Sequence, residues 1–254
     1  VLVFVQALSV AAQTRYWVGG NGEWSDAANW STSPTGVGGA GVPRTTDDVV
    51  ITADTPLSIG LKGLAKCGSI VVDARSAPIR FHGGDESELD IAGAWRCKGD
   101  VRWNAPATIR LAVHRQGVEV DLRGAIVAGD VLLDGTGSWA VMSDLIIGGD
   151  LRVRQGTFIA NAARISAHRV RTEAPAQGTI LAGRSIWSLA AMPSGDLLNL
   201  LQRPSTTLVV DGDVVLQPEG QLGGADRDLN VCGTDPGQMP FTVNAQVVTN
   251  YNGY

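Results

Sequence analysis

The chain has 254 residues, of which 44% are hydrophobic and 18% charged, and it carries a formal net charge of −5 with a pI near 5.2. This acidic balance, without any run of five or more basic residues, argues against binding to nucleic acid or to anionic lipid. There are 32 glycines, whereas an average usage of about 7% would give roughly 18. Because Val, Ile and Leu are also plentiful, the composition indicates tight turns between short strands and not disorder.

The first twelve residues, Val1 to Ala12, are apolar and end in small side chains. Val10 and Ala12 fit positions −3 and −1 of a signal-peptidase site, with Gln13 as the first mature residue. We therefore interpret residues 1–12 as the remnant of an export signal, the alternative being an ordinary buried strand. No other apolar run reaches the ~18 residues needed to cross a bilayer. The expectation is a secreted, cell-surface protein without membrane insertion.

The next segment is rich in tryptophan and turn-forming residues. Residues 16–31 read Y-W-V-G-G-N-G-E-W-S-D-A-A-N-W-S, and a Gly-rich run and V-P-R-T-T-D-D-V-V-I follow. This opening resembles the W-V-G-G-x-G-x-W-S-D-x-x-N-W-S segment of very large, adhesin-like surface proteins of Bacteroidetes-type bacteria, which are often exported by the gliding-associated secretion system. The resemblance implies a β-solenoid that follows the opening, and an exported surface protein.

Trp17, Trp24 and Trp30 have two interpretations. Rigid aromatic rings at a surface could stack on sugars, which would make these residues glycan contacts. Alternatively, they cover the open N-terminal end of the solenoid, since stacked coils expose an apolar end that needs a cap. We favour the cap.

A literal G-x-G-x-x-G occurs at Gly36 to Gly41. The dinucleotide-binding fingerprint needs a strand before it and a helix after it. Pro34 precedes this run, and Pro43 and a strand follow it. We therefore expect a loop and no nucleotide cofactor.

From Ile51 onward, short β-rich segments alternate with Gly or Asp turns. Examples are residues 69–73, 107–113 and 117–122. In the last of these, Val118, Val120 and Leu122 alternate with charged residues, which predicts a strand with one buried and one solvated face.

A degenerate repeat accompanies these strands. I-V-A-G-D-V at residues 126–131 recurs as I-I-G-G-D-L at 146–151 and V-V-D-G-D-V at 209–214, and more weakly as R-C-K-G-D-V at 96–101. Spacings near 20 residues are typical of stacked solenoid coils. In such a coil, Gly with positive φ and Asp bonded to its local backbone would turn the corner.

The predicted fold is therefore all-β, a right-handed parallel β-helix over residues 13–235 with a Trp-rich N-terminal cap. A β-sandwich is the alternative, because N-G and D-G pairs typical of hairpins also occur. Residues 137–158, from G-S-W-A-V-M-S-D-L-I-I-G-G-D-L to Q-G-T-F, also resemble the recurring coils of the same Bacteroidetes solenoids. Trp103, Trp139 and Trp187 are expected in or over coils.

The C-terminal region contains one candidate helix. Residues 194–201, with Ser194 as N-cap, are predicted to form a short helix. Residues 236–254 resemble the start of the repeat modules that follow such solenoids, so we interpret them as a truncated module.

Several acidic groups suggest chemistry. Asp226, Asp228 and Asn230 have the spacing of a calcium loop, but the Gly and the bidentate Glu of that loop are missing, so this calcium candidate is weak and no other cofactor is expected. Glu86, Glu88 and Asp90 would share one face of a strand, where a solvated face is the simpler interpretation than a cation or acid–base site.

An enzyme acting on polysaccharide would need, on one face of the solenoid, several carboxylates or a Ca²⁺ with a basic Arg or Lys. The nearest candidates are five residues: Asp130, Asp134, Asp150, Arg152 and Arg154. The three histidines, His82, His114 and His168, fit no catalytic motif. The cysteines Cys67, Cys97 and Cys232 fit no zinc motif and are interpreted as small buried residues.

Three functions remain open at this point. The favoured one is a non-catalytic structural and interaction module of a large exported adhesin, which supports the downstream domains of the same chain and contacts glycans or surfaces. The second is a carbohydrate-binding module that uses the surface tryptophans. The third is a polysaccharide lyase or hydrolase of the β-helix type, because fold alone does not determine function.

Overall fold

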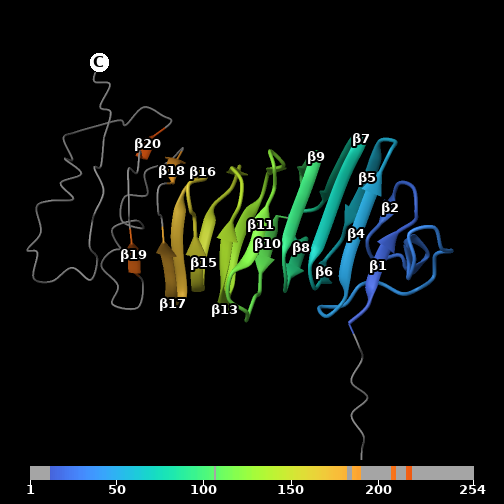
Figure 1. Cartoon of the computed structure of the whole chain (residues 1–254), viewed down its shortest axis with the longest axis horizontal. Coiled ribbons are helices and arrows are strands. Elements are labelled where there is room, and N and C mark those ends of the chain that lie inside the picture. Colours follow the sequence, from blue (N-terminus) through green and yellow to red (C-terminus); the bar gives the residue numbers. More distant parts are fainter. Residues whose placement is uncertain (1–11, 106, 182–184, 190–206, 210–215, 219–254) are drawn as a thin grey trace, which may run out of the picture.

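In the computed structural model, the chain forms a parallel β-solenoid of about six turns. The structure describes residues 12–105, 107–181, 185–189, 207–209 and 216–218. The strands lie side by side along the long axis of the molecule (Figure 1). Between successive coils every strand pairing is parallel, and this excludes the β-sandwich alternative, which needs antiparallel hairpins.

Each coil contributes strands to three stacks, which we call ladders 1, 2 and 3. Ladder 1 contains β1 (Thr14–Trp17), β4 (Asp48–Ala53), the first parts of β7 (Ile70–Gly83) and β9 (Trp95–Trp103), β11 (Val118–Asp121), the second parts of β13 (Asp130–Val141), β15 (Leu151–Ile159) and β17 (Val170–Leu181), and β19 (Thr207–Val209). Ladder 2 contains β2 (Gly22–Glu23), β5 (Leu57–Leu61), the second parts of β7 and β9, β12 (Ile126–Val127), β14 (Leu145–Ile147), β16 (Arg164–Ala167), β18 (Ile186–Leu189) and β20 (Leu216–Pro218).

Ladder 3 contains β6 (Leu64–Cys67), β8 (Glu88–Ile91), β10 (Thr108–Leu111) and the first parts of β13, β15 and β17. Two elements remain outside the ladders, the 3-10 helix η1 (Ala27–Asn29) and β3 (Trp30–Ser31).

The core consists of residue columns that run across the coils, because equivalent inward positions are partners in the parallel register. In ladder 2 the column is Ile59, Phe81, Trp103, Val127 and Ile147, and every member is buried. In ladder 3 it is Ala65, Leu89, Ile109, Val131 and Leu151. Alternation in the strands thus produces a continuous apolar interior.

The strands predicted over residues 69–73, 107–113 and 117–122 correspond to β7, β10 and β11. Val118, Val120 and Leu122 are buried as expected. Trp103 and Trp139 are fully buried inside the coils. Trp187 belongs to β18.

The Gly-Asp repeat is only partly confirmed. Ile126 is paired with Ile146 and Val131 with Leu151, so these two copies occupy equivalent places at the corner between ladders 2 and 3. The weaker copy does not, because its Val101 pairs with Ile79 inside ladder 2. The copy at 209–214 also differs, since its Val209 lies in ladder 1, and residues 210–214 are outside the described part.

The predicted corner chemistry was also wrong in detail. Gly149 lies beside the preceding coil, where a Cβ would come within 2.4 Å of Asp130 Oδ1, and it does not need a positive φ. Asp130 Oδ1 accepts a hydrogen bond from the backbone N–H of Asp150, one coil further on, at 2.8 Å. The Gly-Asp pair therefore joins neighbouring coils instead of stabilising its own turn.

Residues 1–11, the expected helix at 194–201 and the module at 236–254 lie outside the described residues, as does the predicted boundary at 235. No helix among the residues that the structure describes is both long and apolar enough for a membrane span.

Candidate functional site

Two regions contain the residues singled out in the sequence, the N-terminal cap and the outer face of ladder 3. In the cap, Trp17, Trp24 and Trp30 are 6%, 2% and 0% exposed and pack edge to face, with ring centroids 5.0 and 4.7 Å from that of Trp30. The indole N–H of Trp30 donates to the carbonyl of Trp24 at 2.7 Å. A ring that stacks on a sugar needs an exposed face, so the burial favours the interpretation as a cap over glycan contact through these three rings.

Asn29 holds the cap together. Its Nδ2 donates to the carbonyl of Glu23 at 2.9 Å, and its backbone carbonyl accepts from Val18 at 2.9 Å. A Cβ on Gly19 would come within 2.2 Å of the Asn29 side chain, and one on Gly22 within 2.6 Å. The glycines and the asparagine of the opening motif are thus explained by close packing inside the cap.

The Gly-rich run 36–41 is a loop, as expected, that lies over η1. Gly38 approaches Ala28 so closely that a Cβ would clash with the Ala28 carbonyl oxygen. The backbone N–H of Gly39 donates to Ala27 at 2.9 Å. No helix follows the run, since the chain continues into β4, so it lacks the geometry of a dinucleotide site.

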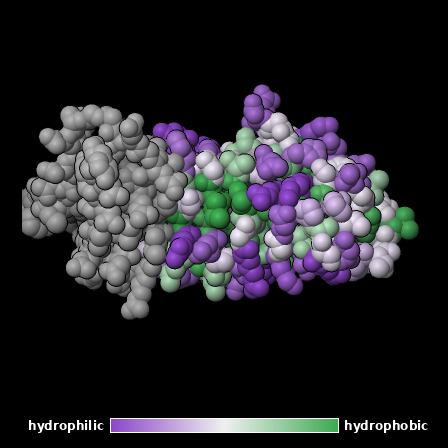
Figure 2. Space-filling view, turned by 90° about the horizontal axis from the view of Figure 1, so that it is seen from above, coloured by the Kyte–Doolittle hydropathy of each residue, from purple (hydrophilic) through white to green (hydrophobic). Residues whose placement is uncertain are grey.

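The outer face of ladder 3 carries a continuous set of ion pairs, which we call the charged network. Its members come from β8, β10, β13, β15, β17 and the adjoining corners: Glu88, Asp90, Arg110, Asp130, Asp134, Asp150, Arg152, Arg154, His168, Arg169, Arg171 and Glu173. Because equivalent positions are stacked, a residue finds its partner about one coil away in sequence. Seen from above, with the long axis of the solenoid horizontal, hydrophilic side chains cover much of the described surface (Figure 2).

Arg110 is the centre of one half of the network. Its Nε donates to Asp90 Oδ1 at 2.7 Å and its Nη2 to Asp90 Oδ2 at 2.5 Å. It also contacts Glu88 at 3.2 Å and Asp134 at 3.4 Å. The bidentate hydrogen bond with Asp90 raises the pKa of the guanidinium above its ordinary value.

The other half centres on four carboxylates and four arginines. Arg154 joins Asp134 at 2.8 Å to Glu173 at 2.9 Å. Arg152 contacts Glu173 and, at 3.3 Å, Asp130.

Asp150 is the last carboxylate of this half of the network. It accepts from Arg169 at 2.8 Å and faces Arg171 at 3.0 Å and His168 at 3.0 Å. Burial would raise the pKa of Asp150, but hydrogen bonds from Arg169 and His168, together with the charges of Arg169 and Arg171, lower it on balance.

Glu88 differs from the other carboxyl groups of the network. Burial raises its pKa first, and the charge of Asp90 and a hydrogen bond with Asp90 raise it further, while Arg110 and Arg152 oppose the shift. Glu86, predicted to share this face, instead lies exposed in the turn before β8. A raised carboxyl pKa is the direction of shift that a general acid needs.

The structure therefore brings together all five sequence candidates for polysaccharide chemistry, namely Asp130, Asp134, Asp150, Arg152 and Arg154. Sequence reasoning missed Arg110, Glu173, Arg169 and Arg171. Alternation in T-I-R-L at 108–111 already placed Arg110 on the outer face, but its partners depend on the register between coils.

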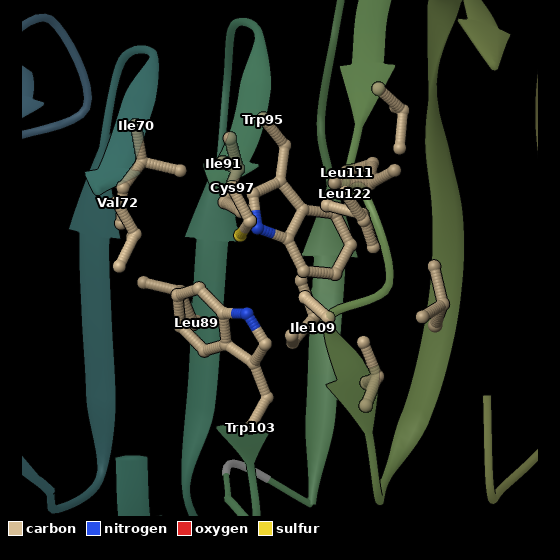
Figure 3. Close-up of a cluster of buried hydrophobic side chains, with 14 of the residues drawn as sticks. Ile70, Val72, Leu89, Ile91, Trp95, Cys97, Trp103, Ile109, Leu111 and Leu122 are labelled. Carbon is tan, nitrogen blue, oxygen red and sulfur yellow. The ribbon is translucent and has the colours of Figure 1, made fainter. Parts of the chain in front are cut away.

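The described residues contain no group of three or more His, Cys, Asp or Glu arranged to hold a metal ion, and the calcium candidates Asp226, Asp228 and Asn230 lie outside them. Cys67 and Cys97 are free and buried, which confirms the interpretation as small core residues for these two. Burial raises the pKa of Cys97 to about 12. Cys97 lies beside Trp95 and Trp103 in the interior (Figure 3).

The geometry defines the chain as a three-sided parallel β-solenoid with an internally packed N-terminal cap and one highly charged outer face. Comparison with models of known protein families, with curated proteins and with solved structures finds no match.

Proposed function

We propose that this chain is a non-catalytic structural and interaction module of a large exported bacterial surface adhesin, which supports downstream repeats and contacts extracellular glycans or surfaces. The observation that carries the proposal is the cap. The residues by which the opening resembles exported Bacteroidetes adhesins, including Gly19, Gly22, Asn29 and Trp30, bond and pack with one another. Their role is to close one end of a long scaffold, which fits a supporting module.

The charged network also favours a scaffold. Its carboxylates are occupied by ion pairs within the chain. Asp134 lies between Arg110 and Arg154, and Asp90 accepts two hydrogen bonds from Arg110. Such pairs connect coils, because each joins residues about one turn apart.

Labelling of intact cells tests this proposal. An antibody raised against residues 13–181 should label intact cells of the source bacterium as strongly as permeabilised cells. Labelling that appears only after permeabilisation would overturn export to the surface. A strain lacking the gene should adhere less to a polysaccharide-coated surface; undiminished adhesion would contradict the adhesin role.

A polysaccharide lyase or hydrolase is the second candidate, and Glu88 is the observation that favours it. Its pKa is raised, which is the direction of shift a general acid needs, and it lies on a face that also presents Asp130 and Asp134. Incubation of the protein with acidic and neutral polysaccharides tests this candidate. Shortened chains whose formation is lost in Glu88→Gln but not in Glu86→Gln would establish an enzyme.

A further inference from the structure

The connection between β10 and β11 is longer than its counterparts. It comprises residues 112–117, whereas the same corner takes only residues 68–69 between β6 and β7 and residues 92–94 between β8 and β9. His114, Arg115, Gln116 and Gly117 at its tip are exposed. The extra residues therefore project from the solenoid at the corner between ladders 3 and 1.

This loop is held in place by the next coil. The carbonyls of Val113 and Arg115 accept from the backbone N–H groups of Gly137 and Ser138, at 2.9 and 3.0 Å. The N–H of Gly117 donates to Ser138 Oγ at 2.7 Å. Gly117 has a φ of 64°, which favours glycine, and Val113 is fully buried. The exposed tip is thus presented by an ordered backbone, as a recognition loop on a rigid scaffold requires.

The projecting tip borders a hollow that is open to solvent. It has a volume of about 340 Å³, and its lining includes Ser69, Ala94, Arg96, Arg115, Gln116 and Glu119. This volume is at the lower end of the roughly 300–1,000 Å³ typical of small-ligand sites. The hollow would therefore accept a unit of the size of one sugar residue.

The side chains around the hollow carry a net positive charge. Arg96 donates to Glu119 Oε2 from Nε at 2.9 Å and from Nη2 at 2.5 Å, so these two charges balance. Arg115 forms no ion pair within the part of the chain that the structure describes. The hollow thus has a surplus of one positive charge on a protein whose net charge is −5.

We propose that this hollow binds a carboxylated sugar, such as a uronic acid unit of an acidic polysaccharide. Arg115 would pair with the sugar carboxylate, since a guanidinium matches a carboxylate with two parallel hydrogen bonds. The Gln116 amide would bond to sugar hydroxyls, and the wall at Arg96 and Glu119 would position the ring. This inference rests on the proposed glycan-contacting function and names its ligand class and its site.

Binding of oligogalacturonate to the full chain tests the inference, with dextran oligomers as the neutral probe. The unmodified protein should bind oligogalacturonate, and affinity should fall at least tenfold in Arg115→Ala and in Arg115→Ala/Gln116→Ala. The matched control is Arg123→Ala, which removes an exposed arginine paired with Asp121 at another corner and should leave affinity unchanged. Amide shifts of Gly117 and Glu119 in NMR spectra should move on addition of the oligomer.

Unchanged binding in Arg115→Ala, equal loss in Arg123→Ala, equal affinity for dextran, or no binding to oligogalacturonate would each overturn the inference. Because all three variants change only exposed side chains, their melting temperatures should match that of the unmodified chain. The surface labelling of intact cells is independent of these outcomes, so the site can fail while the adhesin proposal stands.

Discussion

Phe81 and Trp103, in neighbouring coils of ladder 2, stack face to face, with ring centroids 3.7 Å apart and planes 4° from parallel. Both rings are fully buried. Trp103 also meets Trp95 edge to face at 5.6 Å. The stack therefore connects two coils through the interior of the solenoid, whereas the backbone hydrogen bonds of the ladders connect them along its walls.

This stack should give a measurable coupling energy. A double-mutant cycle with Phe81→Leu and Trp103→Leu should show a coupling of about 0.5–1.5 kcal/mol beyond the lost burial. Chemical denaturation of the four proteins provides the measurement. A parallel cycle that pairs Phe81→Leu with Trp139→Leu, in ladder 1 of a later coil, should give coupling near zero. Equal coupling in both cycles would contradict a direct ring–ring interaction.

Neighbouring isoleucines in β14 should respond oppositely to a charge. Ile147 is 2% exposed and points into the core, whereas Ile146 is 38% exposed on the outer face. Ile147→Asp should destabilise the protein by several kcal/mol, about 3 or more, since it buries an unpaired charge. Ile146→Asp should change stability by about 0.5 kcal/mol or less. Thermal or chemical denaturation would measure both, and similar losses in the two variants would contradict the register.

Asn29→Ala should weaken the cap. The change leaves the carbonyl of Glu23 without its side-chain donor and opens space beside Gly19 and Gly22. We expect a loss of about 1–3 kcal/mol in the free energy of unfolding. Asn21→Ala is the matched control, because Asn21 makes an exposed hydrogen bond to the N–H of Ser58 and should cost less than about 1 kcal/mol. A larger loss at position 21 than at position 29 would refute the central role of Asn29.

Asp150 should stabilise the fold at neutral pH. The folded-state pKa of Asp150 is lowered from its ordinary value of 3.8, so its stabilising contribution is present above that value and disappears as the pH falls through the folded pKa. Asp150→Asn should therefore be less stable than the unmodified chain at pH 7. The gap should narrow when denaturation is repeated in steps down to about pH 3. A gap that does not change with pH would indicate a steric effect instead.

Glu88 should show the opposite pH dependence. Because its folded-state pKa is raised above 4.5, the folded protein binds its proton more tightly than the unfolded chain does. Stability should decrease as the pH rises through this raised pKa, and Glu88→Gln should remove that decrease. Urea denaturation of both proteins across pH 4–8 measures the difference. If Glu88→Gln loses stability relative to the parent with rising pH, the pair with Arg110 outweighs the effect of Asp90.

Much of the fold could be predicted from local pattern. Alternation in V-E-V-D-L at 118–122 correctly placed the buried side chains, and the spacing between Ile126 and Ile146 predicted two stacked coils. The tryptophans predicted a cap because stacked coils expose an apolar end that must be covered. Each of these signals depends only on residues close in sequence, so a single sequence is enough to reveal it.

The positions of the corners and the ion-pair partners across coils could not be predicted from local pattern. Partner positions are 19 residues apart from Trp139 to Phe158 but 25 apart from Ile70 to Trp95, so no single period aligns the coils. The R-C-K-G-D-V segment matched the repeat in letters but turns a different corner. In the charged network, the partner of an arginine depends on coil length, and thus on loop residues that carry no hydrophobic signal.

The cap also gives the solenoid a direction. β3 runs antiparallel to β1, whose other side pairs in parallel with β4, and so both edges of β1 are occupied. A coil duplicated anywhere after β4 would find a parallel neighbour on either side and could be accommodated without changing the rest. A coil placed before β1 would meet a strand of the wrong polarity, so gene duplication can lengthen this molecule only on the C-terminal side of its cap.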